Sequence, residues 1–463
     1  METRRTFLGW LGATALSAQS QRQKPNFLIL LTDDQRFDTL RAVYGGPWRT
    51  PNLDRLSREG VVFTNACTQG GLTGAICMPS RAQLLTGQSV FRAHRGIVDR
   101  QADPDPAMIT FPELLGQRGY RTFATGKWHN GPKLFNRSFQ EGTDLFFGGM
   151  SDQVKTLVRD YDPSGKYPAE AGRITNRFSS EVFSDAAIRF LKGRNQEKPF
   201  LAYVAYTSPH DPRMAPQRFA DLFPPDKIEL PPNFLPQHPF DNGELKVRDE
   251  MLAAFPRTPA EIRRHIAGYL AMVAEVDHQI GRVLDALEAS GEAGNTYVIF
   301  AGDNGLAVGQ HGLMGKQNLY EHSIRVPLVV RGPGLPRGQR AATLCHLMDV
   351  APTVAGLAGA ELAGAIDGRS LQPVLAEPGR KVRESVVAAY RGFQRAIRTE
   401  EYKLIRYRVG GAGTDQLFDV VRDPFETRNL ANDRKHAALV ATLRRSLHRQ
   451  LAEAGDPEAD QWA

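Results

Sequence analysis

A short stretch in the first hundred residues combines a thiol, a proline and a cation. It reads C-M-P-S-R at 77–81, and L-L-T-G follows at 84–87. Pro79 is typical of a first helical turn, and Gly87 is typical of a helix end. Cys77 therefore stands where free helix N–H groups, and Arg81 one turn further on, favour negative charge. This environment suits chemistry on an anion.

Two continuous apolar runs end in acidic residues. The run 25–31 is followed by Asp33 and Asp34, and the run 296–301 is followed by Asp303 and Asn304. Such runs predict strands buried on both faces of a parallel sheet, and open α/β sheets bind ligands at the carboxyl ends of their strands. Adjacent carboxylates there are costly unless a cation neutralises them, and a hard divalent ion is the natural partner. The alternative for Asp33 and Asp34 alone is a solvated turn.

Further cations and imidazoles also follow predicted strands. Lys127 and His129 come after the run 120–124, and His210 comes after the run 199–206. Taken alone, the lysine and histidine pair is typical of a surface loop. A single histidine among prolines is typical of a residue that stiffens a loop by a hydrogen bond.

In this order, the segments resemble the type I sulfatases of the alkaline phosphatase superfamily. The family signature is C-x-P-S-R followed by L-L-T-G, and similar motifs here are T-P-N-L-D-x-L at 50–56, G-K-W-H at 126–129 and D-N-G at 303–305. The resemblance covers nearly the whole chain after the first twenty residues. It implies that Cys77 is oxidised to formylglycine, an aldehyde whose hydrate attacks sulfur, whereas the stretch alone also fits a buried cysteine beside an ordinary helix start.

The resemblance also implies the roles of the other residues. One calcium ion is expected, with the ligands Asp33, Asp34, Cys77, Asp303 and Asn304. Lys127 and Lys316 are expected to bind the sulfate, and Arg81 to steady the hydrated aldehyde. His210, alone or together with Lys316, is expected to protonate the departing alcohol, and His129 to remove a proton from the second hydroxyl.

The substrate predicted from export, mild positive charge and a long loop is a sulfated carbohydrate rather than a small aryl sulfate. The proline-rich stretch 216–256 lacks periodicity, and such stretches are often functional, so we expect it to rim the pocket. The residues expected to set substrate preference are His94, Arg95, Trp128, Arg213 and His311.

The pattern of elements predicts an α/β fold with a large mixed, mostly parallel sheet flanked by helices. Long helices are expected at 173–192 and 259–287, where apolar residues recur at threes and fours. Short strand-like runs after residue 380 and a final helix at about 435–453 predict a small antiparallel sheet plus helix. We therefore expect a catalytic domain at 21–380 and a C-terminal subdomain at 381–463.

Residues 1–20 are expected to be a twin-arginine signal peptide. Arg4 and Arg5 precede an apolar run through Leu16, and the run is too short to span a bilayer comfortably. The alternative is an N-terminal helix that merely contains two arginines. The signal implies a bacterial protein of the periplasm or the cell exterior, with the twin-arginine export machinery and a formylglycine-generating enzyme as partners.

The composition is that of a globular protein with a full core. The 463 residues are 41% hydrophobic and 24% charged, with a net charge of +7. Because no basic run is interleaved with aromatic residues, no nucleic-acid partner is expected. Of the three cysteines, Cys67 and Cys345 are expected to be buried thiols, and the sequence leaves their pairing open.

Two other functions remain open at this stage. A phosphonate or phosphate monoester hydrolase of the same superfamily can share the formylglycine signature. A non-catalytic protein that binds sulfated glycans would result if Cys77 were never oxidised.

Overall fold

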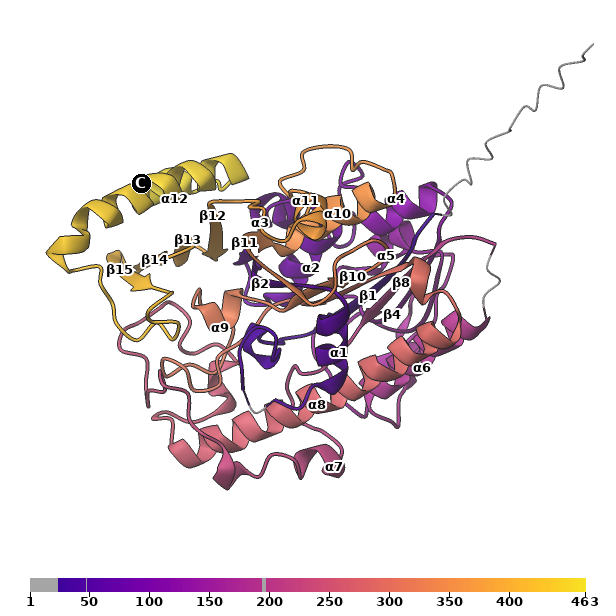
Figure 1. Ribbon diagram of the computed structural model, residues 1–463. Helices are drawn as coiled ribbons and strands as arrows, with labels where there is room; N and C mark the ends of the chain where they lie inside the picture. Colours follow the sequence, from indigo (N-terminus) through magenta and orange to yellow (C-terminus); the bar gives the residue numbers. More distant parts are fainter. Residues whose placement is uncertain (1–23, 47, 194–196) are drawn as a thin grey trace, which may run out of the picture.

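A computed structural model describes residues 24–46, 48–193 and 197–463, and its centre is an eight-stranded sheet between two layers of helices (Figure 1). The strand order is β11-β2-β10-β9-β1-β8-β4-β5. In that order the strands are Gln339–His346, Val61–Cys67, Leu328–Arg331, Thr296–Gly302, Asn26–Thr32, Phe200–Ala205, Arg121–Lys127 and Glu141–Phe146. Within this sheet β10 runs antiparallel to both neighbours, and the other pairings are parallel. The predicted fold class is confirmed.

The central strand β1 is buried on both faces. Phe27, Ile29 and Leu31 belong to one apolar cluster, and Leu28 and Leu30 belong to another, as the period of two along a strand requires. The first cluster is covered by α2 (Cys77–Thr86), α3 (Val90–Ala93), α4 (Phe111–Gln117), α5 (Pro132–Ser138), α10 (Val350–Leu357) and α11 (Gln372–Ala376). The second is covered by α1 (Pro51–Glu59), α6 (Ser179–Gly193) and α8 (Pro259–Ala289).

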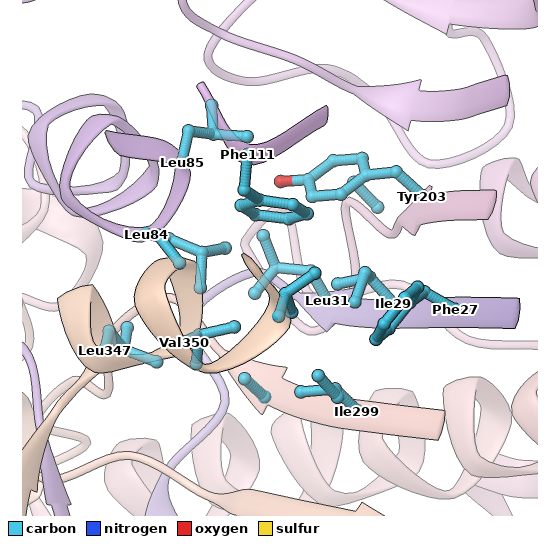
Figure 2. Packing of buried hydrophobic residues seen from close by; sticks show 14 of the residues in the cluster. Phe27, Ile29, Leu31, Leu84, Leu85, Phe111, Tyr203, Ile299, Leu347 and Val350 are labelled. Carbon is cyan, nitrogen blue, oxygen red and sulfur yellow. The ribbon is translucent and has the colours of Figure 1, made fainter. Parts of the chain in front are cut away.

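Helix α2 is fixed to the sheet by its apolar side. Leu84 and Leu85 lie in the same cluster as Ile29 and Leu31 of β1 and Val350 of α10 (Figure 2). Leu84 and Leu85 are 1% exposed or less. Full burial of such a side chain contributes about 1.5–3 kcal/mol, so this packing holds the helix in place.

A second sheet, in the order β15-β14-β13-β12-β3, carries α12 (Ala437–Ala454). Its strands are Ala412–Asp419, Tyr402–Val409, Gln394–Thr399, Ser385–Tyr390 and Gly70–Gly71. The first four are antiparallel, but β3 comes from the chain just before Cys77 and pairs in parallel with β12. A Cβ at Gly70 would lie 2.4 Å from Ala389 O, so only glycine permits this approach. The predicted C-terminal subdomain is thus joined to the catalytic part through a shared sheet.

Two regions differ from the sequence-based expectation. The helix expected at 173–192 begins only at Ser179, because β7 (Arg173–Ile174) pairs with β6 (Leu157–Val158). The stretch 216–256 is mainly irregular, as expected, with α7 (Gln217–Ala220) and short 3-10 turns. Elsewhere in the chain, the short helix α9 (Glu321–Ile324) precedes β10. Among the described residues, no helix has the length and apolar character needed to cross a membrane. The predicted signal peptide at 1–20 lies outside the described residues.

Candidate active site

The carboxyl ends of β9, β1, β8 and β4 lie side by side at one edge of the central sheet. Thr32 is in register with Gly302, Leu31 with Ala205, and Ala205 with Gly126. The polar residues at these ends are Asp33 and Asp34 after β1, Asp303 and Asn304 after β9, His210 after β8, and Lys127 as the last residue of β4. The parallel register therefore brings them together.

Cys77 is the first residue of α2 and is 2% exposed. Lys316 donates from Nζ to Cys77 Sγ at 2.9 Å and to the two oxygens of Asp34 at 2.6 and 2.9 Å. The Cys77 thiol itself donates to Asp34 Oδ1 at 3.6 Å. One lysine thus contacts both the thiol and a strand-end carboxylate.

Burial, together with the negative charge of Asp33, raises the pKa of the Cys77 thiol well above its usual value. Burial lowers the pKa of Lys316, but the negative charge of Asp34 outweighs it and holds that pKa well above its usual value. The thiol is therefore protonated at neutral pH, and a protonated thiol is a weak nucleophile.

Arg81 is fully buried one turn after Cys77 and links α2 to two strand ends. Its Nε donates to Asp303 Oδ2 at 2.9 Å, and its Nη1 donates to the backbone oxygen of Lys127. These two hydrogen bonds hold the sheet edge, whereas Nη2 is buried without a hydrogen-bond partner among the described residues. The expected role of Arg81 toward the modified Cys77 stays a prediction.

The carboxylates at this edge form a site that fits a divalent cation. Ligand atoms of Asp33, Asp34, Cys77 and His210 all lie within 4.8 Å of one another. Asp33 Oδ1 and Asn304 Oδ1 are buried and have no hydrogen-bond partner among the described residues. The donors are chiefly oxygens, which is the chemistry that hard cations prefer.

Asp303 differs from the other predicted metal ligands. Its Oδ1 accepts from the backbone N–H of Asp34 at 3.0 Å and of Asn304 at 2.8 Å, and its Oδ2 accepts from Arg81. Burial and the charge of Asp33 raise the pKa of Asp303 to about 6. Asp303 thus organises the loops around the site, and its role as a metal ligand stays a prediction. His210 supplies one of the four ligand atoms that lie within 4.8 Å of one another.

Lys127 and His129 stand on the side of the site formed by β4. Lys127 is fully buried and forms an ion pair with Asp33. Burial raises the pKa of Asp33, but the charges of Lys127, His210 and Arg81 outweigh it and hold that pKa well below its usual range. Burial and the charges of Lys127 and Arg81 lower the pKa of His129 well below its usual value. His129 is therefore neutral and able to accept a proton.

His210 lies in the loop after β8, with Nε2 3.7 Å from Asp34 Oδ2. Its Nδ1 is 2.8 Å from the backbone oxygen of Asp211, and Gln153 donates to the backbone oxygen of His210 at 2.9 Å. These contacts direct Nε2 toward the carboxylates.

Tyr269 of α8 is a residue at the site that the sequence did not reveal. Its hydroxyl donates to the backbone oxygen of Asp34 at 2.9 Å and accepts from the N–H of Arg36 at 2.9 Å. Asp34 has a φ of 63°, a left-handed conformation that is costly for a residue with a side chain. Tyr269 stabilises this turn, although its spacing in the sequence indicates only core packing.

The irregular stretch 216–256 also reaches the site. Arg248 forms an ion pair with Asp211, and Asp249 Oδ2 accepts from Gln317 Nε2 at 2.7 Å. Gln317 follows Lys316 directly. No pattern in the stretch singled out Arg248 or Asp249, and its expected position at the rim of a pocket stays a prediction.

The residues predicted to set substrate preference are dispersed. Trp128 is 1% exposed, packs edge-on against Phe135 and Phe139, and donates to Gly131 O at 2.7 Å, so it belongs to the core. His311 is stacked on Tyr320 with ring centroids 3.9 Å apart. Neither ring contacts the residues around Cys77 through the interactions described.

His94 and Arg95 lie in one turn of π-helix, His94–Val98, beside a cavity of about 710 Å³. His94 Nε2 is 3.1 Å from Asp99 Oδ1, and Arg95 donates to Gly455 O at 2.9 Å. Gly455 ends α12, so Arg95 holds the C-terminal helix. The residues lining this cavity include neither Cys77 and Lys316 nor any of the polar residues named above at the strand ends.

The remaining two cysteines are buried and free. Cys67 lies in a small cluster with Leu344, whereas Cys345 lies in the main core. Because Leu344 and Cys345 are consecutive in β11, their side chains point to opposite faces. Cys67 and Cys345 are therefore on opposite faces of the sheet and cannot form a disulfide in this structure.

The fold and the strand-end site define a hydrolase of the alkaline phosphatase superfamily. The sulfatase family model matches residues 25–360, and the model described as N-sulphoglucosamine sulphohydrolase, C-terminal, matches residues 309–453. The chain belongs to the sulfatase family and is a sulfatase of the arylsulfatase-like type.

Three similar proteins illustrate the range of this family. The N-acetylglucosamine-6-O-sulfatase of Bacteroides thetaiotaomicron is 27% identical, over 97% of this chain and 90% of the relative. The protein BT4656, solved in complex with its substrate D-glucosamine-2-N,6-O-disulfate, has a TM-score of 0.79 and 25% identity, over 95% of this chain and 99% of that one. The phosphonate monoester hydrolase of Agrobacterium radiobacter has a TM-score of 0.74 and 22% identity, over 93% and 96%, and shares the fold.

Proposed function

We propose that this sulfatase releases inorganic sulfate from a sulfate monoester of a carbohydrate. The observation that carries the proposal is the position of Lys316, whose Nζ contacts both Cys77 Sγ and the Asp34 carboxylate. A cation at this place can bind a sulfate beside Cys77, the residue that occupies the position of the nucleophile. The relatives that act on glucosamine sulfates support a sugar as the alcohol part of the ester.

The nucleophile in this proposal is a formylglycine made from Cys77. Burial and Asp33 raise the pKa of the thiol, which makes the unmodified residue a weak nucleophile. The signature C-x-P-S-R at 77–81 supports the modification. The hydrated aldehyde supplies a hydroxyl that attacks sulfur and a second hydroxyl that allows sulfate to leave by elimination.

The metal in this proposal is calcium, held by Asp33, Asp34, Asp303, Asn304 and the modified Cys77. The unpartnered oxygens of Asp33 and Asn304 support a hard cation at this place. When bound, such an ion polarises a sulfate oxygen. Tyr269 holds the Asp34 turn in the conformation that presents its carboxylate.

The other residues move protons and bind charge. Lys127 and Lys316 neutralise the sulfate oxygens, and Arg81 keeps the sheet edge and α2 in place. His210 donates a proton to the departing alcohol, and neutral His129 accepts the proton of the second hydroxyl. His94 and His311 stay predictions as substrate contacts.

The cellular setting follows from the first twenty residues. Arg4 and Arg5 before a short apolar run support export by the twin-arginine route, with oxidation of Cys77 by a maturation enzyme before export. The mature protein would act in the periplasm or outside the cell.

The deciding experiment is peptide mass spectrometry across Cys77 combined with turnover of 4-nitrophenyl sulfate. We expect an aldehyde or its hydrate at Cys77, sulfate release that calcium chelation abolishes, and no release by Cys77→Ala. An unmodified thiol in protein from its native host, with no hydrolysis of any sulfate ester, would falsify the proposal and favour a non-catalytic glycan-binding role.

A phosphonate or phosphate monoesterase activity has less support. It rests on the fold shared with the phosphonate monoester hydrolase. The ratio of kcat/KM for 4-nitrophenyl sulfate to that for phenyl 4-nitrophenyl phosphonate separates the two functions. We expect the sulfate ester to be the better substrate.

A further inference from the structure

Arg213 is a cation near the site whose guanidinium has no hydrogen-bond partner among the described residues. All three guanidinium nitrogens are screened from water, and none has a hydrogen-bond partner among the described residues. The guanidinium carbon lies 5.7 Å from the centre of the Tyr269 ring, and the stem packs against Gly268 of α8. The residue as a whole remains partly exposed.

Arg213 is linked to the Asp34 turn through Tyr269. It follows His210 by three positions, and the hydroxyl of the ring beneath it holds the backbone of Asp34. Burial lowers the pKa of Arg213, while the charges of Asp211, Asp34 and Asp249 act in the opposite direction. The carboxylates that raise the pKa of Arg213 are thus those at the site.

Those carboxylates are already engaged by other donors. Arg248 donates to both oxygens of Asp211, at 3.2 Å to Oδ1. Asp249 accepts from Arg248 at 3.0 Å and from Gln317 at 2.7 Å. Lys316 donates hydrogen bonds to both oxygens of Asp34. Arg213 is therefore a surplus cation rather than the counterion of any one of them.

A guanidinium removed from water without acceptors is unfavourable, so a ligand that brings acceptors gains from binding it. The planar fork of arginine fits the two oxygens of a carboxylate or a sulfate. The scissile sulfate already has Lys127 and Lys316 in the proposed function. An oxyanion for Arg213 must then come from another part of the substrate.

We propose that Arg213 binds a second oxyanion carried by the alcohol part of the substrate, so that the preferred esters are sugars with two anionic groups. This inference rests on the proposed function. The oxyanion is an N-sulfate or O-sulfate on the same sugar, or a uronate carboxylate on the adjoining one.

The test uses matched esters that differ in one group. One set compares glucosamine-2-N,6-O-disulfate with N-acetylglucosamine-6-sulfate, and further pairs place the second sulfate at other hydroxyls. A second set compares sulfated disaccharides with and without a uronate carboxylate. 4-Nitrophenyl sulfate, which has no second anion, is the reference substrate for every variant.

The variants are Arg213→Met, which removes the charge, and Arg213→Lys, which keeps the charge and removes the fork. The control is Arg218→Met, because Arg218 is an exposed arginine of α7 whose guanidinium lies 4.9 Å from the Phe219 ring. We expect wild-type enzyme to prefer a dianionic member of at least one pair. In Arg213→Met the kcat/KM on that member should fall by about 10- to 100-fold more than on 4-nitrophenyl sulfate. For Arg213→Lys, the loss of kcat/KM on the dianionic ester should lie between those of wild-type enzyme and Arg213→Met. Arg218→Met should keep the wild-type ratio of kcat/KM on the dianionic ester to that on 4-nitrophenyl sulfate.

The outcomes separate this inference from the proposed function. If wild-type enzyme hydrolyses sulfate esters without preferring any dianionic member, the inference is wrong and the proposed function stands. The inference is equally wrong if Arg213→Met lowers the melting temperature and reduces kcat/KM on all substrates by one common factor, because that pattern indicates a structural role. If matured wild-type enzyme hydrolyses no sulfate ester at all, the proposed function itself fails.

Discussion

Cys77 and Cys67 lie in two buried, charged regions that differ in what the thiol contacts. The two residues are 2% and 1% exposed. Burial and nearby carboxylates raise the pKa of both thiols, that of Cys67 to about 11. Neither burial nor the direction of the pKa shift therefore distinguishes a candidate active-site cysteine from a structural one.

The contacts distinguish them. Cys77 begins a helix and accepts a hydrogen bond from Lys316 at 2.9 Å. Within the described part of the chain, the Cys67 thiol donates only to the backbone oxygen of Asn65, at 3.8 Å, and Cys67 packs against Leu344. The charges near Cys67 form a junction cluster that joins α9 to the second sheet, with the members Glu321, Arg398, Lys403 and Glu426. Buried charges that pair across elements support the fold, whereas charges that converge on a thiol form a candidate site.

The largest expected effect separates the two cysteines directly. Cys77→Ala should lower kcat on 4-nitrophenyl sulfate by at least about a thousandfold, because it removes the proposed nucleophile. Cys67→Ala should keep kcat within about twofold and lower the free energy of unfolding by about 1 kcal/mol. Purified variants should be assayed at equal folded concentration. Comparable losses of kcat in both would remove the distinction.

Two buried lysines give the next effect. Lys316→Met should lower kcat/KM by about 100- to 1,000-fold, because the cation beside Cys77 is lost. Lys403→Met leaves Glu321 and Glu426 without their shared cation, and should cost about 3–5 kcal/mol of stability while kcat stays within about twofold. Denaturant titration and steady-state kinetics on the same preparations measure both quantities. A fall in kcat for Lys403→Met as large as that for Lys316→Met would contradict the comparison.

A smaller effect is expected at Tyr269. Tyr269→Phe keeps the ring and removes the hydroxyl that holds the Asp34 turn, so calcium affinity should fall by about 10-fold or more. Calorimetric titration with calcium measures this without substrate. The matched control is Tyr206→Phe, which removes a buried hydroxyl bonded to Ser184 at 2.9 Å. Equal calcium affinities in the two variants would exclude a positioning role for Tyr269.

The last prediction concerns the pH dependence of stability beside the junction cluster. Burial and the charges of His238 and Lys403 lower the pKa of His311 to about 3. Because an unfolded histidine titrates near pH 6.5, the unfolded state binds one more proton below that pH and stability falls on acidification. His311 should contribute about 1.4 kcal/mol per pH unit to this slope between roughly pH 6 and 4. His311→Phe keeps an aromatic ring against Tyr320 and should show a shallower slope in urea titrations; an unchanged slope would contradict this.

The local elements of the fold follow from the sequence because they depend on local patterns. Continuous apolar runs predicted β1, β8 and β9, and apolar residues at threes and fours predicted α8. The positions of Asp33 and Asp303 follow from the ends of β1 and β9, and that of Lys127 follows from the end of the run 120–124. The start of α2 at Cys77 and its end before Gly87 likewise follow from proline and glycine chemistry.

Only the tertiary structure decided which distant groups meet. Two examples are the pairing of β3 with β12 and the hydrogen bond from the Tyr269 hydroxyl to the backbone of Asp34. A third is the position of the Arg213 guanidinium, which has no hydrogen-bond partner among the described residues. The placement of Trp128 in the core rather than in the pocket depends on which face of the loop packs against Phe135.

The physical reason for this division is the range of each interaction. A sequence pattern reports backbone preferences and the period of burial within a few residues, and these set the elements and their ends. Side-chain partners are chosen by packing between elements, where a hydrogen bond forms only if both groups arrive within about 3 Å. The sequence by itself therefore determined the kind of residues at the sheet edge, and the three-dimensional arrangement decided which of them contact Cys77.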